Sequence, residues 1–321
     1  MIINERNIKM WSTIGQRATF GIAALELAKE VSNLMVLTCD VSTSAGLDRF
    51  RKTFPDKYLD LGIAEQNMIG VAAGLSSEGY NVITTTFAPF QTMRCCEQIK
   101  VNIGYMKQKV CMVGIGSGLA LGTLGYTHCC IEDVGSIRSI PGIDIISPAD
   151  SLETVKALEA SVKSKNSTYI RLTGVSNNPI IYNKDYEFKI GESVQLKKGK
   201  DVTIFCTGSV VNNCLEAAKI LDSKKISTRV VNMHTIKPID KKAIDDSCDS
   251  KLIVSVEEHN IFGGLGSSIA EYKASLNSAP KQLFIGINDK YSKGGSYKFL
   301  QEKHGLTYQK IVNEILKNYK D

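Results

Sequence analysis

The sequence predicts an α/β protein made of two three-layer α/β/α domains, each built around a mostly parallel sheet. Short apolar segments rich in β-branched residues alternate with longer segments of helical periodicity, a pattern typical of parallel sheets with helices on both faces. This alternation stops at a polar, Gly- and Lys-containing stretch, residues 175–200, and then resumes. The length of 321 residues also suits two domains of ordinary size.

Before the interruption, apolar strands are predicted at 34–40, 81–87, 109–116, 144–148 and 167–174. Helices are predicted at 17–32, 65–79 and 151–164. Ser151 is the predicted N-cap of the last of these helices. Ligands collect at the carboxyl ends of parallel strands. The residues at or near such ends are Asp40, Phe87, Gly116 and Arg171.

After the interruption, strands are predicted within 202–208, 227–240, 251–259 and 282–287. Helices are predicted within 210–224, 263–275 and 307–319. We therefore expect a first domain over 1–178, a linker with a small hairpin over 179–196, and a second domain over 197–321.

The composition excludes several classes of protein. Hydrophobic residues make up 43% and charged residues 22% of the chain, as in ordinary globular proteins. No apolar run reaches the ~18 residues that span a bilayer, and the N-terminus lacks the apolar core of a secretory signal. The net charge of +6 is spread along the chain, without the basic stripe of a nucleic-acid binder. The nine cysteines are scattered, so we expect reduced thiols in a cytoplasmic protein.

Two Gly-rich motifs and the histidines give weak functional signals. The segment "GGLGSS" at 263–268 resembles a phosphate-binding loop but lacks the full spacing, and "GIGSG" at 114–118 precedes no clear helix. We interpret both as structural turns. The four histidines have no metal-ligand spacing, so we expect no metal site made by this chain alone. His128 lies in a Gly-containing loop after a strand, where a histidine is as often an ordinary polar residue as a catalytic one.

Glu65 is the most unusual charge in the sequence. It opens an apolar helix, and its carboxylate has two interpretations. The ordinary one is stabilisation by the free N–H groups of the first helical turn. The functional one is contact with a ligand, because apolar surroundings favour a protonated carboxyl that can share its proton with a basic ring nitrogen.

Four motifs in a fixed order decide between these interpretations. They are "DLGIAEQN", "TTFAPF", "GYTH" and "EEHNIFGGLGSS". With them, the chain resembles the C-terminal half of transketolase and the equivalent region of 1-deoxyxylulose-5-phosphate synthase. The resemblance covers nearly the whole chain. It is strongest to the second polypeptide of split transketolases, which holds a pyrimidine-binding domain and a C-terminal domain.

The resemblance implies thiamine diphosphate as the cofactor and assigns residues to it. Glu65 matches the glutamate that hydrogen-bonds the aminopyrimidine ring and activates the cofactor. Phe87 matches the aromatic residue that stacks on this ring, Phe90 matches a second aromatic residue of the pocket, and Ile63 lies in the same motif as Glu65. His128 matches the catalytic histidine that contacts the substrate oxygens.

For the substrate, the resemblance places Arg17, Ser44 and Arg171 at positions of phosphate ligands. The chain also departs from the family pattern. Gly116 stands where a histidine is expected, Leu124 where an aspartate is expected, Tyr126 where proline is usual, and Met93 where an aromatic residue is usual. These differences leave the sugar substrate open.

The chain lacks the "GDG…N" segment that holds Mg²⁺ and the cofactor diphosphate in this family. The resemblance therefore implies an N-terminal partner subunit, an α₂β₂ assembly and activity only in the presence of that partner. The expected reaction is transfer of a two-carbon ketol unit between phosphorylated sugars. The alternatives are a subunit of an enzyme that decarboxylates a 2-oxo acid, such as a deoxyxylulose-phosphate synthase or a 2-oxo acid dehydrogenase β subunit, and a non-catalytic binding subunit.

Overall fold

The computed structural model describes residues 1–173 and 175–319, so the end of the strand predicted at 167–174 lies outside the described residues. The helices are α1 (Glu5–Glu30), α2 (Asp48–Thr53), α3 (Glu65–Ser77), α4 (Ala88–Gln91), α5 (Cys96–Gln98), α6 (Asp133–Arg138), α7 (Ser151–Lys163), α8 (Val211–Ser223), α9 (Lys241–Asp245), α10 (Leu265–Lys273), α11 (Tyr297–Lys303) and α12 (Tyr308–Asn318). The strands are β1 (Leu34–Thr38), β2 (Tyr58–Asp60), β3 (Asn81–Phe87), β4 (Val110–Ile115), β5 (Ile143–Ile146), β6 (Ser167–Leu172), β7 (Val194–Lys197), β8 (Val202–Cys206), β9 (Thr228–Asn232), β10 (Thr235–Lys237), β11 (Leu252–Asn260) and β12 (Lys281–Ile287).

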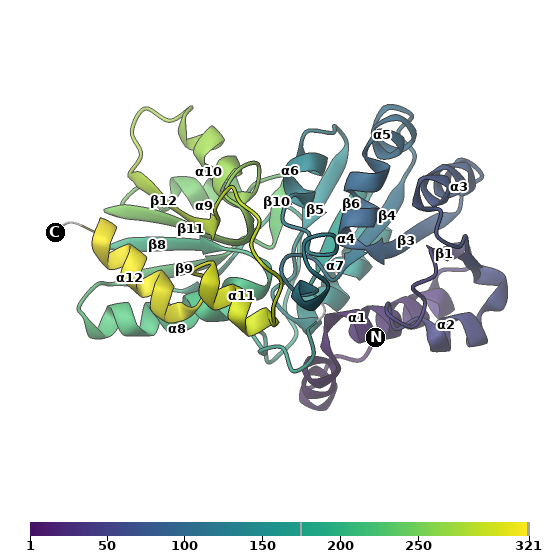
Figure 1. The fold of residues 1–321 in the computed structure, drawn as a ribbon, viewed down its shortest axis with the longest axis horizontal. Helices are drawn as coiled ribbons and strands as arrows, with labels where there is room; N and C mark the ends of the chain where they lie inside the picture. The colour runs from purple at the N-terminus through teal and green to yellow at the C-terminus, as the bar shows by residue number, and fades with distance from the viewer. Residues whose placement is uncertain (174, 320–321) are drawn as a thin grey trace.

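These strands form two sheets that lie beside each other (Figure 1). The first has the order β10-β5-β6-β4-β3-β1-β2 and is parallel except for β10, which runs antiparallel to β5. The second has the order β12-β11-β8-β9-β7 and is parallel except for β7. The predicted fold class is therefore confirmed.

The two halves of the chain are joined more closely than the sequence indicates. Strand β10 comes from the second half but completes the first sheet. Strand β7 begins within the predicted linker and pairs with β9 at the edge of the second sheet, in place of the small hairpin predicted there. The boundary near residue 180 stays a prediction, since a strand of one half lies in the sheet of the other.

Each sheet has helices on both faces, and the side chains of its central strands are accordingly almost all buried. On one face of the first sheet, α1 and α7 bury side chains such as Trp11 and Phe20. On the other face, α3 and α6 bury Met68 and Ile137. In the second sheet, α8 and α12 cover one face, and α9 and α10 cover the other.

Two local features refine the predicted helices. Gly15 interrupts α1 with φ +83°, and a Cβ there would lie 2.6 Å from the Val175 carbonyl oxygen, so the chain needs glycine at this break. The helix predicted from residue 17 is the part after the break. Helix α7 is capped by Asp150, whose carboxylate accepts from the Glu153 N–H at 2.8 Å, so the prediction of Ser151 as its N-cap is wrong by one residue.

None of the helices among the described residues is long and apolar enough to cross a bilayer.

Candidate functional site

The site begins where β3 and β4 end side by side, with Phe87 paired with Ile115. Gly116 follows with φ +64°. A Cβ on Gly116 would lie 2.8 Å from the Leu121 side chain and 3.4 Å from the Phe87 ring. The side chain of Leu121 thus fills the space into which a larger residue at 116 would extend.

Three rings gather at these strand ends. Phe87 closes β3, Phe90 lies one helical turn further on in α4, and His128 comes from the loop between β4 and α6. The His128 ring centroid lies 6.1 Å from that of Phe87 and 5.4 Å from that of Phe90, and both pairs are close to edge-on. His128 Nδ1 is 3.0 Å from the hydroxyl of Thr127. The structure therefore brings together three residues that the sequence places up to 41 positions apart.

Glu65 is the first residue of α3 and is only 3% exposed. Its Oε1 accepts a hydrogen bond from Arg94 Nη1 at 2.7 Å, in an ion pair. The Arg94 guanidinium lies 3.9 Å from the centroid of the Phe90 ring, in cation–π contact. A chain of contacts therefore links Glu65 through Arg94 and Phe90 to His128.

Arg94 was not anticipated from the sequence. We expected apolar surroundings for Glu65, but the carboxylate is buried against a cation that is 41% exposed. One signal was available in the sequence. Phe90 and Arg94 are four residues apart, and side chains at this spacing lie on the same face of a helix.

Two buried thiols complete the surroundings of Glu65. Burial, with a smaller contribution from the nearby Glu65 carboxylate, raises the pKa of Cys39 to about 11. Burial likewise raises the pKa of Cys95 to about 12, again with a contribution from Glu65. Both groups are therefore neutral thiols at neutral pH and are poor nucleophiles there.

Apolar side chains are exposed beside this site. Ile63, two residues before Glu65, is 77% exposed, and Met93, the chain neighbour of Arg94, is exposed as well. Exposed apolar residues that cluster next to a buried functional group are typical of a surface that a ligand or another chain covers.

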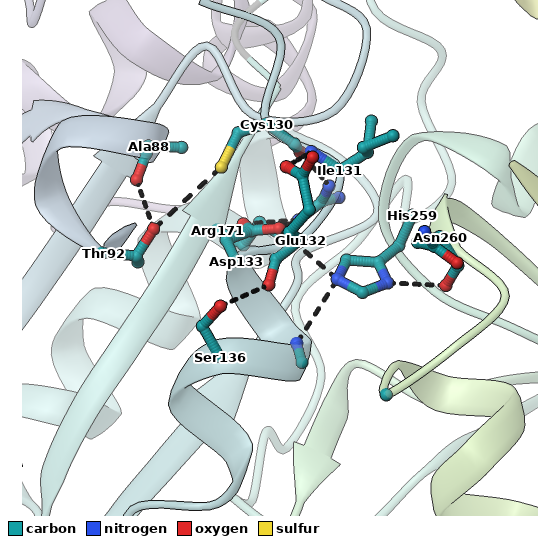
Figure 2. Close-up of polar contacts among 12 residues, drawn as sticks. Ala88, Thr92, Cys130, Ile131, Glu132, Asp133, Ser136, Arg171, His259 and Asn260 are labelled. Carbon is teal, nitrogen blue, oxygen red and sulfur yellow. Dashed lines mark hydrogen bonds and ion pairs between the residues drawn. The ribbon is translucent and has the colours of Figure 1, made fainter. Parts of the chain in front are cut away.

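Arg171 does not belong to the site, so its assignment as a phosphate ligand is corrected here. It is 4% exposed, and its Nε donates to the Asp133 carboxylate at 2.8 Å. Its Nη2 donates to the backbone oxygens of Cys130 at 3.1 Å and Glu258 at 2.8 Å. Figure 2 shows Arg171 and Asp133 next to His259, whose Nε2 lies 3.9 Å from the Asp133 carboxylate. Arg171 is thus a buried structural cation at the junction of the two halves.

Arg17 and Ser44 lie on neighbouring backbone and are both half-buried. The loop that contains Ser44 packs on α1 so closely that a Cβ on Gly46 would lie 3.0 Å from the Arg17 carbonyl oxygen. Burial lowers the pKa of Arg17, but a guanidinium stays charged at neutral pH. Arg17 and Ser44 therefore place a charged guanidinium and a hydroxyl on neighbouring segments of backbone.

The "GGLGSS" segment has a structural partner, in agreement with its interpretation as a turn. The Glu257 carboxylate accepts from the N–H groups of Leu265 at 2.7 Å and Gly266 at 2.8 Å. A Cβ on Gly264 would lie 1.9 Å from this carboxylate. The start of α10 is therefore occupied by a side chain of the same protein.

Across residues 1–173 and 175–319, no group of three or more His, Cys, Asp or Glu side chains is placed to hold a metal ion.

Comparisons with known proteins identify the family of this chain. Residues 12–175 match the family model described as "Transketolase, pyrimidine binding domain", and residues 191–311 match "Transketolase, C-terminal domain". The chain is 37% identical to a "putative transketolase C-terminal section" of Methanocaldococcus jannaschii, over 95% of this chain and 96% of that protein. It is 34% identical to a protein of Phocaeicola vulgatus that is named as one subunit of an apulose-4-phosphate transketolase, over 94% of this chain and 97% of that protein.

A solved structure described as "Split gene transketolase, inactive beta4 tetramer" superposes with a TM-score of 0.86 and 35% sequence identity. The match covers 96% of this chain and 99% of that one. The chain therefore belongs to the transketolase family, as the section that carries the pyrimidine-binding and C-terminal domains.

Proposed function

We propose that this chain is the catalytic partner in a two-chain, thiamine diphosphate-dependent transketolase. The enzyme would move a two-carbon ketol unit from a ketose phosphate to an aldose. The observation that carries the proposal is the buried Glu65 carboxylate, connected through Arg94 and Phe90 to His128. In our assignment Glu65 exchanges a proton with the aminopyrimidine ring, and His128 contacts the substrate oxygens.

The residues present fit the pyrimidine end of this cofactor. The Arg94 guanidinium is a flat, nitrogen-bearing group that bonds the Glu65 carboxylate at 2.7 Å and lies 3.9 Å from the Phe90 ring centroid. In our proposal the aminopyrimidine ring makes these two contacts in place of Arg94. We assign Phe87, Phe90 and the exposed Ile63 to the walls of this pocket. When bound, thiamine diphosphate supplies the carbon nucleophile of the reaction, and this chain supplies orientation and a proton.

The diphosphate and its Mg²⁺ require a second polypeptide in our proposal. The chain lacks the "GDG…N" segment, and the relatives are named as a section or a subunit of a transketolase. The exposed apolar residues beside Glu65 are suited to be covered by such a chain. We propose an N-terminal, diphosphate-binding subunit and an α₂β₂ assembly, in the cytoplasm, where the nine free cysteines would stay reduced.

For the substrate, we assign Arg17 and Ser44 to an anionic group of the sugar. A guanidinium binds a phosphate by charge-assisted hydrogen bonds, and a hydroxyl adds a neutral donor. One relative is named for apulose-4-phosphate, a sugar with such a group. Among residues 1–173 and 175–319, no contact favours a 2-oxo acid or a purely non-catalytic role, so we propose neither.

Co-expression of the chain with the diphosphate-binding subunit from the same genome tests this function. Ketol transfer from a ketose phosphate to an aldose phosphate should appear only when both chains and thiamine diphosphate are present. Decarboxylation of pyruvate without ketol transfer would move the enzyme to the alternative reaction class. Failure of both reactions in a well-assembled complex would contradict a catalytic role.

A further inference from the structure

The loop that contains His128 makes hydrogen bonds and packing contacts with the C-terminal half of the chain at several points along its length. We call residues 116–132, between β4 and α6, the His128 loop. Loops of this kind are mobile unless their backbone groups find fixed partners. Here the partners come from β11, from the segment between β12 and α11, and from α11 itself and the residue that follows it.

The first anchor holds the beginning of the loop. Glu258, at the end of β11 and 1% exposed, accepts from the Leu119 N–H at 2.8 Å. Its other oxygen accepts from the hydroxyls of Ser209 at 2.8 Å and Tyr297 at 2.6 Å. Gly118 is required beside it, because its φ is +63° and a Cβ would lie 2.2 Å from the Glu258 carboxylate. The start of the loop is thus bound to a buried and well-partnered carboxylate.

The second anchor holds the middle of the loop. The Gly122 carbonyl oxygen accepts from the Gly295 N–H at 2.9 Å. A Cβ on Gly122 would lie 2.2 Å from the Leu300 side chain, so α11 packs directly on the loop backbone. Figure 1 shows the segment before α11 running from the second sheet towards the first half of the chain.

The third anchor lies two residues before His128. The Tyr126 hydroxyl is 2.8 Å from His304 Nε2 and 2.9 Å from the Ser292 hydroxyl. Its ring packs on Tyr291 at 5.2 Å between centroids. Burial lowers the pKa of His304, and Lys303 and Lys290 lower it further, so the ring is neutral at neutral pH and can accept from the tyrosine hydroxyl.

We propose that the C-terminal half positions the catalytic loop, with Tyr126 as the positioning residue nearest His128. This proposal rests on the proposed function, because it takes His128 as a catalytic residue. It gives a role to the C-terminal half, which contributes none of the assigned catalytic groups. Tyr126 itself does not touch the substrate. It fixes the backbone that places His128 against Phe87 and Phe90, and reaction rates fall steeply when a catalytic group moves by about 1 Å.

The test uses Tyr126→Phe in the assembled two-chain enzyme, since this change removes one hydroxyl and keeps the ring on Tyr291. Ser292→Ala is a second variant, which removes a partner of the same hydroxyl with little change in volume. The matched control is Tyr272→Phe, which removes a tyrosine hydroxyl bonded to the exposed Asp245 at 3.0 Å. The measurements are amide hydrogen exchange of residues 117–130, kcat for ketol transfer, and the Kd for thiamine diphosphate by calorimetry.

We expect Tyr126→Phe to speed amide exchange in the loop about fivefold to tenfold, the change for one ordinary hydrogen bond. The value of kcat should fall by a similar factor, with the cofactor Kd unchanged within about twofold, and the control should change none of them. Unchanged exchange, or faster exchange with an unchanged kcat, overturns the proposal. If the wild-type complex transfers no ketol unit but Tyr126→Phe still speeds amide exchange in the His128 loop, the proposed function fails. The positioning of the loop by the C-terminal half is then still supported.

Discussion

Replacing Glu65 by Gln separates a catalytic carboxylate from a structural one. The amide keeps the shape of the side chain but loses its charge and its capacity to exchange a proton. A positioned general acid or base contributes about 10²–10⁴ in rate, or roughly 3–5 kcal/mol of barrier. The ion pair with Arg94 contributes far less to folding, ~0.2–1 kcal/mol, because the Arg94 side chain is 41% exposed and its charge is screened by water.

We therefore expect Glu65→Gln to lower kcat by at least about a hundredfold at saturating cofactor. The melting temperature should fall by no more than about 2–4 °C, the shift for ~1 kcal/mol. Stopped-assay kinetics and thermal unfolding of the same two-chain preparation give both values. Glu97→Gln is the matched control, because Glu97 is an exposed carboxylate in the neighbouring helix α5. A rate within tenfold of wild type at saturating cofactor would refute the role assigned to Glu65.

The remaining predictions concern charge and titration. Arg171→Ala should lower the free energy of unfolding by about 3–5 kcal/mol, since it leaves Asp133 buried without its cation, and denaturant titration measures this. His128→Ala should lower kcat more than it raises KM, whereas Arg17→Ala should raise KM for phosphorylated sugars only; equal effects on unphosphorylated sugars would contradict the phosphate assignment. Burial lowers the pKa of His234 from 6.5 to about 4, so the folded chain binds fewer protons than the unfolded chain. Its stabilising effect is therefore present above pH 6.5 and lost as the pH falls towards 4, and His234→Gln should flatten this part of the stability–pH curve.

The strands and helices were largely predictable because their signals are local. The segment 81–87 is apolar and β-branched, and it forms β3 over the same residues. The break at Gly15 shows where α1 changes direction, and the predicted helix starts just after it. By contrast, β10 joins the first sheet through β5, which lies nearly ninety residues earlier in the chain. No local pattern encodes such a pairing, because it depends on how the two halves pack.

The site was predictable where its residues follow the ends of strands or open a helix. The ring centroids of Phe87 and His128 lie 6.1 Å apart and Glu65 is buried, while the roles that the resemblance assigns to these residues stay predictions. Arg171 was misassigned because the sequence does not show whether an arginine in a strand contacts a ligand or is buried against a carboxylate from a distant part of the chain. Arg94 was missed because its ion pair with Glu65 joins residues 29 positions apart, and the four-residue spacing between Phe90 and Arg94 does not indicate that pairing.

Calorimetric titration of thiamine diphosphate, with Mg²⁺, tests the division of the cofactor site most directly. In the isolated chain the ring contacts add about 0.5–1.5 kcal/mol from stacking and ~1.5–3 kcal/mol from one charged hydrogen bond. Association costs ~4–15 kcal/mol, so binding to this chain alone should be millimolar at best. The same titration after mixing with the diphosphate-binding subunit should give much tighter binding. Micromolar binding by the isolated chain would contradict our account, because the diphosphate and metal would then have a site that we have not recognised.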